Sequence, residues 1–194
     1  EETLREVEEK FHNLMLTVPN VAHASVPVGK DSKGNVEIKK WGEVKKFDFT
    51  PKDHIELAKS LDLIDFERGV KVGGFRAYFL KNEAAQMELA VIWYAFNKLI
   101  QKGYTPLIAP SLVKSFTLFG NGQFPWGKEE VYTLEKDDLH LAGTAEVPVT
   151  AYFADEILKE SDLPKKFVAF SPCYRREAGS YGKDTKGAYR VHQF

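Results

Sequence analysis

Residues 167–194 have the sequence FVAFSPCYRREAGSYGKDTKGAYRVHQF, which predicts two extended segments joined by a polar loop. The first segment, 167–177, begins with apolar residues, and the loop that follows it contains three glycines. The residues after the loop, 188–194, favour a strand that returns along the first. Alternation along the first strand would place Arg175 and Glu177 on one face. The sequence therefore predicts a β-hairpin that presents a cation and an acceptor on one surface.

Positive charge is concentrated in this hairpin. Residues 165–194 contain seven lysines and arginines and two acidic residues, a net charge of +5. The whole chain has 27 Lys and Arg against 28 Asp and Glu, so its net charge of -1 gives no sign of a nucleic-acid coat or a membrane anchor. A basic hairpin with a flexible tip suits contacts with phosphate or RNA. The alternative is an exposed hairpin whose lysines only increase solubility.

Upstream of the hairpin, residues 131–134 and 139–142 predict two paired strands, and the residues between them favour a turn. A helix is expected to follow at about 147–159. Thr144 is a suitable N-cap for it, and Glu146 would interact favourably with its dipole, so these two residues alone favour a structural role. A carboxylate at a strand-to-helix corner also suits an amino-acid ammonium group, which keeps a binding role open.

The strongest helix prediction covers residues 82–100, where Asn82 can cap the start and Gly103 supplies a stop. A short strand is expected before it at 75–80, and another after it at 103–110, ending at Pro110 because proline cannot donate to a strand ladder. Core packing is one role for the apolar face of the long helix, and contact with a partner subunit is another. The residues of this apolar face are Ala85, Leu89, Ile92, Phe96 and Ile100.

The first third of the chain predicts three smaller elements. Residues 1–16 have apolar side chains at three-to-four spacing among many charges, which indicates an amphipathic helix. Residues 26–28 and 36–38 favour two short strands around a polar turn. Residues 50–53, Thr-Pro-Lys-Asp, are typical of a capped helix start, and that helix would end near Leu61.

Composition excludes several classes of protein. Hydrophobic residues make up 43% and charged residues 28% of 194, as in a soluble globular domain with at most a small appendage. No run of 18 apolar residues predicts a transmembrane helix. The single cysteine, Cys173, excludes an intramolecular disulfide and favours a reducing compartment, and no Cys/His cluster has metal-ligand spacing. Cys173 and His192 are expected to be structural residues.

Residues 174–194 closely resemble motif 2 of bacterial-type seryl-tRNA synthetases, a family of class II aminoacyl-tRNA synthetases. Residues 144–146, Thr-Ala-Glu, look like the serine-binding loop of that family, and residues 103–110 look like its motif 1. The resemblance implies two domains: 1–16 as the end of the tRNA-binding coiled-coil arm, and 17–194 as a partial catalytic domain without motif 3. On this basis the chain is expected to be part of a longer protein.

The resemblance implies an α+β fold, an antiparallel sheet flanked by helices, with the end of the helical arm at the N-terminus. It implies a cytoplasmic ligase that forms seryl-adenylate from serine and ATP and transfers serine to the 3' end of tRNA(Ser). Homodimerisation through the motif 1 region is expected, and membrane contact is not. Mg2+ would bridge ATP oxygens, and its usual protein ligands in the family lie beyond Phe194, so no metal ligand is expected among these residues.

The resemblance also implies roles for individual residues. Arg175 would be the catalytic cation at the α-phosphate. The ATP site would comprise Arg175, Arg176, Glu177, Arg190, Val191 and Phe194. The serine site would comprise Thr144, Ala145, Glu146 and Arg175.

Lys183 and Lys186 occupy the glycine-rich tip of the hairpin, away from the expected phosphate face. Their expected partner is therefore the tRNA acceptor end.

Two other functions remain open from the sequence. One is a catalytically silent paralogue that dimerises or binds RNA, and the other is a class II relative that activates a different small amino acid. Retention of Arg175, Glu177, Arg190 and the 144–146 loop favours the synthetase, because a silent paralogue has no need of an ATP clamp.

Overall fold

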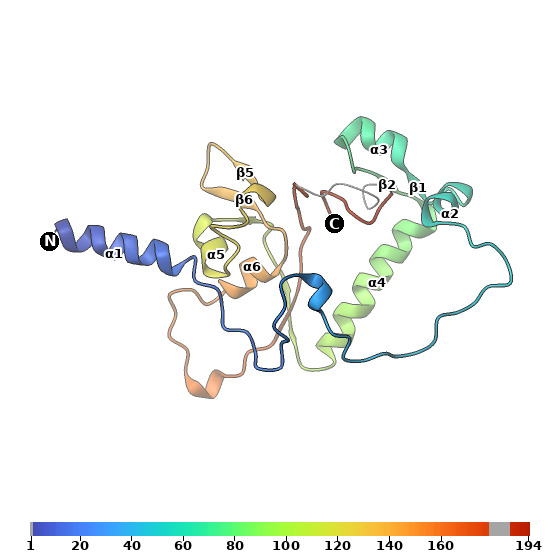
Figure 1. Ribbon diagram of the computed structural model, residues 1–194. Coiled ribbons are helices and arrows are strands. Elements are labelled where there is room, and N and C mark those ends of the chain that lie inside the picture. The colour runs from blue at the N-terminus through green and yellow to red at the C-terminus, as the bar shows by residue number, and fades with distance from the viewer. Residues whose placement is uncertain (1, 179–186) are drawn as a thin grey trace. The chain divides into compact units, whose positions relative to one another are not determined.

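The computed structural model describes residues 2–178 and 187–194 and divides the chain into two compact units, Glu1–Lys52 and Asp53–Phe194. Figure 1 shows the elements of both units. Across the described residues, no helix combines the length and the apolar character needed to cross a membrane.

The first unit begins with α1 (Glu2–Met15), which confirms the predicted amphipathic helix. None of its residues is buried. Its apolar face has no covering within this unit, because Leu4, Val7, Phe11 and Leu14 are each between 56% and 67% exposed.

The two strands predicted at 26–28 and 36–38 are wrong. The only regular element described after α1 in this unit is a 3-10 turn, η1 (Ser32–Gly34), where the Asp31 side chain accepts a hydrogen bond of 2.8 Å from the Lys33 amide. Val28 and Ile38 are fully exposed. An isolated pair of short strands needs an apolar surface to cover, and these side chains have none within the unit. The polar turn forms locally without the strands.

The second unit begins with α2 (His54–Ser60), which starts later than the 50–53 signal predicted: Asp53, not Thr50, is the N-cap, and its carboxylate accepts from the Glu56 amide at 2.8 Å. Next come β1 (Ile64–Asp65), α3 (Phe66–Gly73) and β2 (Phe79–Leu80), and β1 pairs antiparallel with β2. The strand predicted at 75–80 is shorter than expected because Arg76 adopts a left-handed backbone, with φ of 67°.

Helix α4 (Asn82–Ile100) confirms the long-helix prediction, although its capping differs. Lys81 occupies the N-cap, and the Asn82 side chain instead donates to the Asp62 carbonyl at 2.9 Å. The Lys81 ammonium also contacts the Asp62 carboxylate at 2.5 Å, which lowers the pKa of that carboxyl. Gly103, with φ of 84°, follows the helix as predicted.

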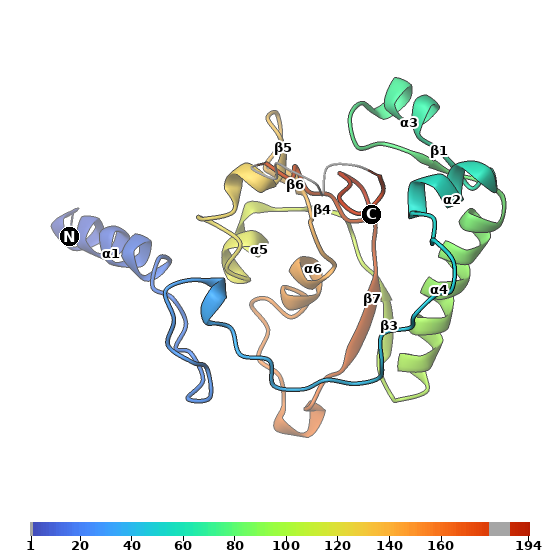
Figure 2. The same cartoon turned by 45° about the vertical axis from the view of Figure 1, so that its right-hand side comes forward.

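Helix α4 packs against a parallel pair of strands, β3 (Thr105–Ile108) and β7 (Phe167–Phe170). Figure 2 shows the two strands running side by side next to the helix. The strands at 103–110 and 167–177 were both predicted, but their parallel pairing was not. Five apolar or aromatic side chains of α4 remain between 62% and 68% exposed: Met87, Leu89, Val91, Trp93 and Tyr94.

A second sheet has the strand order β4 (Leu112–Val113), β6 (Leu139–Leu141), β5 (Tyr132–Leu134), all antiparallel, which confirms the predicted hairpin near 131–142. Two short helices, α5 (Ser115–Gly120) and α6 (Glu146–Thr150), contact each other beside this sheet. Single 3-10 turns occur at η2 (Lys128–Glu130) and η3 (Glu160–Asp162). The sheet and the two short helices enclose the main core, which comprises Val113, Leu118, Phe124, Val131, Ala142 and Val147.

The helix predicted at 147–159 is wrong in length, since α6 ends at Thr150. The chain turns at 151–155, where Asp155 has a left-handed φ of 61° that an α-helix cannot contain. This turn directs Tyr152 and Phe153 onto Phe167 of β7, with ring centroids 5.4 and 6.0 Å apart. Aromatic packing therefore replaces the later turns of the helix. The predicted α+β class is confirmed.

Truncation of Leu118, which is completely buried, should destabilise this unit. We expect Leu118→Ala to reduce the free energy of unfolding by about 2–5 kcal/mol, because lost burial and the remaining cavity both count. Ile157→Ala is the matched control, since that side chain is fully exposed and its loss should cost less than about 0.5 kcal/mol. Urea unfolding of both variants measures the difference, and equal losses would contradict the assigned core.

Candidate functional site

The base of the 174–194 hairpin is held by a short antiparallel contact. Tyr174 forms an isolated bridge with Gln193, and Cys173 and Phe194 exchange two backbone hydrogen bonds of 2.7 and 2.9 Å. The strands predicted to run through 177 and back from 188 are therefore too long. Pro172 cannot donate to a ladder, and Glu177 has a left-handed φ of 52°, so regular pairing is limited to the base.

Glu177 and Arg190 face each other across this base. Nη1 of Arg190 donates to the Glu177 carboxylate at 2.7 Å. The Glu177 side chain is 15% exposed and the Arg190 side chain 46%. The structure thus joins two predicted site residues on opposite limbs, although the strand alternation expected to align Arg175 with Glu177 stops before Glu177.

Arg175 lies between the hairpin and the 143–146 loop. Its Nε donates to the Gly143 carbonyl at 3.2 Å, and its guanidinium carbon is 5.2 Å from the centroid of the Phe194 ring. The Tyr174 amide donates to the Ala142 carbonyl at 2.9 Å, which fixes the backbone beside the same loop. The predicted cation of the ATP site is therefore adjacent to the predicted serine loop.

The loop itself leads directly into α6. Ala145 occupies the N-cap position, and the Thr144 hydroxyl accepts from the Glu146 amide at 3.2 Å. Thr144 therefore makes the capping contact that a structural role predicts, although it lies one position before the N-cap residue Ala145. The Glu146 residue is exposed in the first turn of α6, where a carboxylate is favoured by the helix dipole.

The remaining predicted site residues differ in their contacts and in their burial. The guanidinium of Arg176 is 6.0 Å from the Tyr132 ring, Val191 is buried, and Phe194 is half exposed. Lys183 and Lys186 lie outside the described residues.

The two residues expected to be structural have local partners. The His192 ring nitrogen Nδ1 lies 3.1 Å from the Arg175 carbonyl, and the Cys173 thiol donates to the Ser171 carbonyl at 3.4 Å. The His192 contact joins the two limbs of the hairpin, whereas the Cys173 contact stays within the outgoing limb.

Sequence reasoning missed two residues that contact the outgoing limb. Glu130 accepts the Arg176 amide at its carbonyl, at 2.9 Å, and the Ala178 amide at its carboxylate, at 3.2 Å. Arg76 is 9% exposed, and its Nη1 lies 3.5 Å from the Glu177 carbonyl. A glutamate before a strand and an arginine after a glycine pair carry no motif, so only the tertiary structure identifies them.

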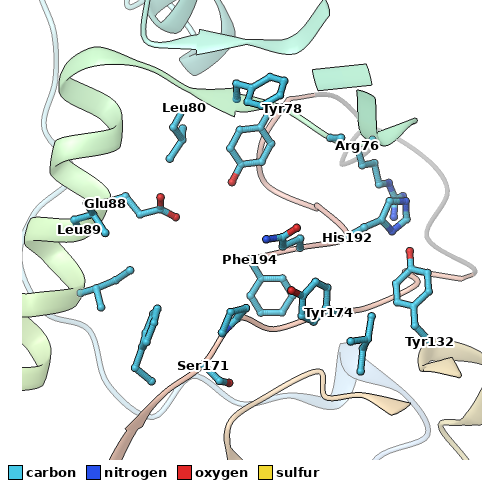
Figure 3. A pocket seen from close by; sticks show the side chains of 18 residues that line it. Arg76, Tyr78, Leu80, Glu88, Leu89, Tyr132, Ser171, Tyr174, His192 and Phe194 are labelled. Atoms are coloured by element: carbon cyan, nitrogen blue, oxygen red, sulfur yellow. The ribbon is translucent and has the colours of Figure 1, made fainter. Parts of the chain in front are cut away.

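A cavity of about 630 Å³ lies beside the hairpin, between β2, α4 and the paired limbs. Figure 3 shows Tyr78 and Glu88 on one side and Tyr174, His192 and Phe194 on the other. Burial, and then the charge of Glu88, raise the pKa of the Tyr78 phenol above its usual value. Of the predicted site residues that the structure describes, Phe194 is the one that lines this cavity.

No metal centre is evident in the described ranges 2–178 and 187–194. No group of three or more His, Cys, Asp or Glu side chains lies there in an arrangement that could hold a metal ion.

The family model of the tRNA synthetase class II core domain (G, H, P, S and T) matches residues 130–194. The chain is 50% identical over 190 residues to the serine–tRNA ligase of Fervidobacterium nodosum, which covers 98% of this chain and 45% of that protein.

Two solved structures resemble the whole chain. The crystal structure of seryl-tRNA synthetase from Pyrococcus horikoshii complexed with ATP has a TM-score of 0.94 at 40% identity, over 100% of this chain and 48% of that one. The cytoplasmic serine–tRNA ligase from Naegleria fowleri in complex with AMP has a TM-score of 0.90 at 32% identity, over 100% of this chain and 46% of that one.

The chain thus spans slightly less than half the length of these relatives. Sequence identity, core-domain match and backbone similarity all point to the same group. Over nearly its whole length, the chain is homologous to the serine–tRNA ligases reported above, and its residues 130–194 match the class II tRNA synthetase core domain.

Proposed function

We propose that the protein containing this chain activates serine with ATP and transfers it to the 3' end of tRNA(Ser). The observation that carries the proposal is the position of Arg175, bonded to Gly143 at 3.2 Å and set over the Phe194 ring. Residues attributed to nucleotide and serine binding thereby lie next to each other, as a reaction between the two substrates requires.

In the first step, a carboxylate oxygen of serine attacks the α-phosphorus of ATP. The bond from that phosphorus to the bridging oxygen breaks, and pyrophosphate leaves. Arg175 stabilises the charge that develops on the α-phosphate oxygens, and its bond to Gly143 orients it before ATP arrives. In the second step, a ribose hydroxyl of tRNA attacks the seryl carbonyl carbon, the bond from that carbon to the AMP oxygen breaks, and the hydroxyl proton passes to the phosphate of the departing AMP.

Arg190 and Glu177 contribute to nucleotide binding as a pair. A guanidinium has five N–H donors, so Arg190 can keep its bond to Glu177 and donate others to a γ-phosphate. Phe194, half exposed beside Arg175, offers a ring face for adenine. The Val191 backbone and Arg176 complete the proposed ATP site.

The proposed serine site is the loop before α6. The exposed Glu146 carboxylate pairs with the ammonium of serine, and Thr144 and Ala145 shape the loop that holds it. Arg175 reaches this loop through Gly143 and contributes to both sites.

Mg2+ is expected from the family resemblance, and when bound it would neutralise phosphate charge. The acidic residues in the described part of the chain do not cluster as a set of metal ligands. We therefore assign no protein ligand for Mg2+ to this chain and no catalytic step to the ion.

The remaining assignments are also proposals. The exposed helix α1 supports a role for residues 1–16 as the end of an arm, with 17–194 contributing to the catalytic domain. The single cysteine supports a cytoplasmic location.

Arg175→Ala in the intact protein should reduce serine-dependent exchange between pyrophosphate and ATP by about 100-fold or more, because a preorganised donor is lost. Arg68→Ala removes an exposed arginine of α3 and should leave exchange near normal. Unchanged exchange in Arg175→Ala would remove this residue from the mechanism. If the wild-type protein shows no exchange with any amino acid tested, the silent paralogue is favoured. If it shows exchange with an amino acid other than serine, the class II relative is favoured.

Residues 82–110 should form the interface of a homodimer, because the outward side chains of α4 are apolar and exposed. Trp93→Asp should convert the dimer to a monomer in light scattering, since a buried unpaired carboxylate is costly at an interface. Trp126→Asp is the matched control, as this exposed tryptophan lies outside the segment. A wild-type monomer, or a dimer unaffected by Trp93→Asp, would contradict the assignment.

Replacement of both Lys183 and Lys186 by Ala should weaken aminoacylation of tRNA and its salt dependence, while serine-dependent exchange stays near normal. This proposal rests on their place in the basic tip of the sequence. The double variant Lys59→Ala/Lys71→Ala removes two exposed lysines elsewhere and controls for total charge. Equal loss of both activities would instead assign the tip lysines to the ATP site.

A further inference from the structure

The segment that precedes the long helix contacts both limbs of the hairpin base. Arg76, in the loop after α3, reaches the outgoing limb at the Glu177 carbonyl. His54, the first residue of α2, lies against the returning limb at Gly187 and Tyr189. Glu177 lies on one limb and its partner Arg190 on the other, so the two contacts flank the ion pair that joins them.

Arg76 is suited to holding a backbone in place. Its residue is only 9% exposed, its Nη1 lies 3.5 Å from the Glu177 carbonyl, and its guanidinium carbon lies 5.4 Å from the Phe75 ring centroid. Figure 3 shows Arg76 among the cavity-lining residues, together with Tyr174 and His192 of the two limbs. A buried guanidinium keeps its place only when its surroundings satisfy it, so Arg76 and the outgoing limb constrain each other.

His54 shapes the returning limb through the space that it fills. Its ring centroid is 4.1 Å from that of Tyr189. A Cβ at position 187 would collide with His54 Nε2, and it would also lie 3.1 Å from Ile55 Cγ1. Gly187 has a φ of 81°, so both backbone conformation and available space require glycine at this position.

We propose that Arg76 and His54 form a two-point seat that positions the Glu177–Arg190 pair for ATP. Both act as positioning residues, through the backbone of the outgoing limb and the close packing of the returning limb. The inference rests on the proposed function for its link to ATP, whereas the seat itself is a property of the fold. It assigns a catalytic consequence to a segment without any catalytic motif.

The test of Arg76 is a split between substrates in serine-dependent pyrophosphate exchange by the intact protein. We expect Arg76→Met to raise KM for ATP about tenfold, because one hydrogen bond from a charged group is lost, and to leave KM for serine unchanged. Arg76→Lys keeps a donor and should restore most of the affinity. Arg68→Met, on α3 and paired with Asp65, is the matched control and should behave as wild type.

His54 is tested by a double-mutant cycle with Gly187. Gly187→Ala strains the backbone in any background, but the collision with the imidazole exists only when His54 is present. The rise in KM for ATP caused by Gly187→Ala should therefore be smaller in a His54→Ala background than in wild type, by a factor of about three or more. Equal rises in both backgrounds would overturn the role of His54.

A readout independent of activity separates the seat from the proposed function. The Arg175 amide donates to the His192 carbonyl and the Phe194 amide to the Cys173 carbonyl, so amide hydrogen exchange at Arg175 and Phe194 reports on the base. In Arg76→Met this exchange should accelerate while that of α4 stays unchanged. If wild type lacks serine-dependent exchange, the proposed function fails and hydrogen exchange alone decides the seat. Unchanged protection of the base, or equal rises in KM for both substrates, would overturn the seat.

Discussion

The parallel pairing of β3 with β7 is the constraint on which the arrangement of the second unit depends. Backbone hydrogen bonds join Thr105 to Lys166 at 2.8 Å and Ala109 to Phe170 at 2.9 Å, at the two ends of the pair. This pairing sets both the position and the direction in which the chain enters the hairpin base. The Tyr174 amide can then reach the Ala142 carbonyl, and Arg175 lies beside Gly143. A contact between distant segments thus brings together two loops that are far apart in sequence.

The same pairing supports α4 on one side only. One face of the helix packs on the two strands, while Met87 and Val91 on the other side are 62% and 64% exposed. Burial of apolar surface contributes roughly 25 cal/mol per Å², so an uncovered face of this kind leaves stabilisation unused within one chain. This exposed apolar surface of α4 therefore lies in the region where the family resemblance predicts contact with a partner subunit.

Local patterns predicted the elements that depend on local contacts. The prediction of α4 was correct because its apolar spacing and the glycine that follows it are local signals. The helix predicted from 50–53 forms as α2, but it starts only at His54, because Asp53 rather than Thr50 provides the N-cap. The strands at 26–38 were wrong because alternation alone does not supply a surface to cover. The α6 prediction was too long because packing of Tyr152 and Phe153 on Phe167 outweighs helical preference.

For the candidate site, the resemblance identified residues but not their surroundings. It named Arg175, Glu177 and Arg190, and the structure adds that Arg175 is oriented by Gly143 and that the other two are paired. The contribution of Arg76 could not be predicted, because its side chain meets the hairpin only after α3 and the limbs have packed. Tertiary contacts of this kind leave no periodic signal in a sequence.

The ion pair across the base has a consequence for the entropy of ligand binding. An arginine side chain that is free to rotate loses up to about 2 kcal/mol of conformational freedom when it becomes fixed. In this structure Arg190 is held by Glu177 at 2.7 Å. Much of that freedom is therefore lost when the chain folds, before any nucleotide arrives. In the proposed ATP site, an incoming phosphate group would therefore meet a guanidinium that is already ordered and whose positive charge is partly compensated.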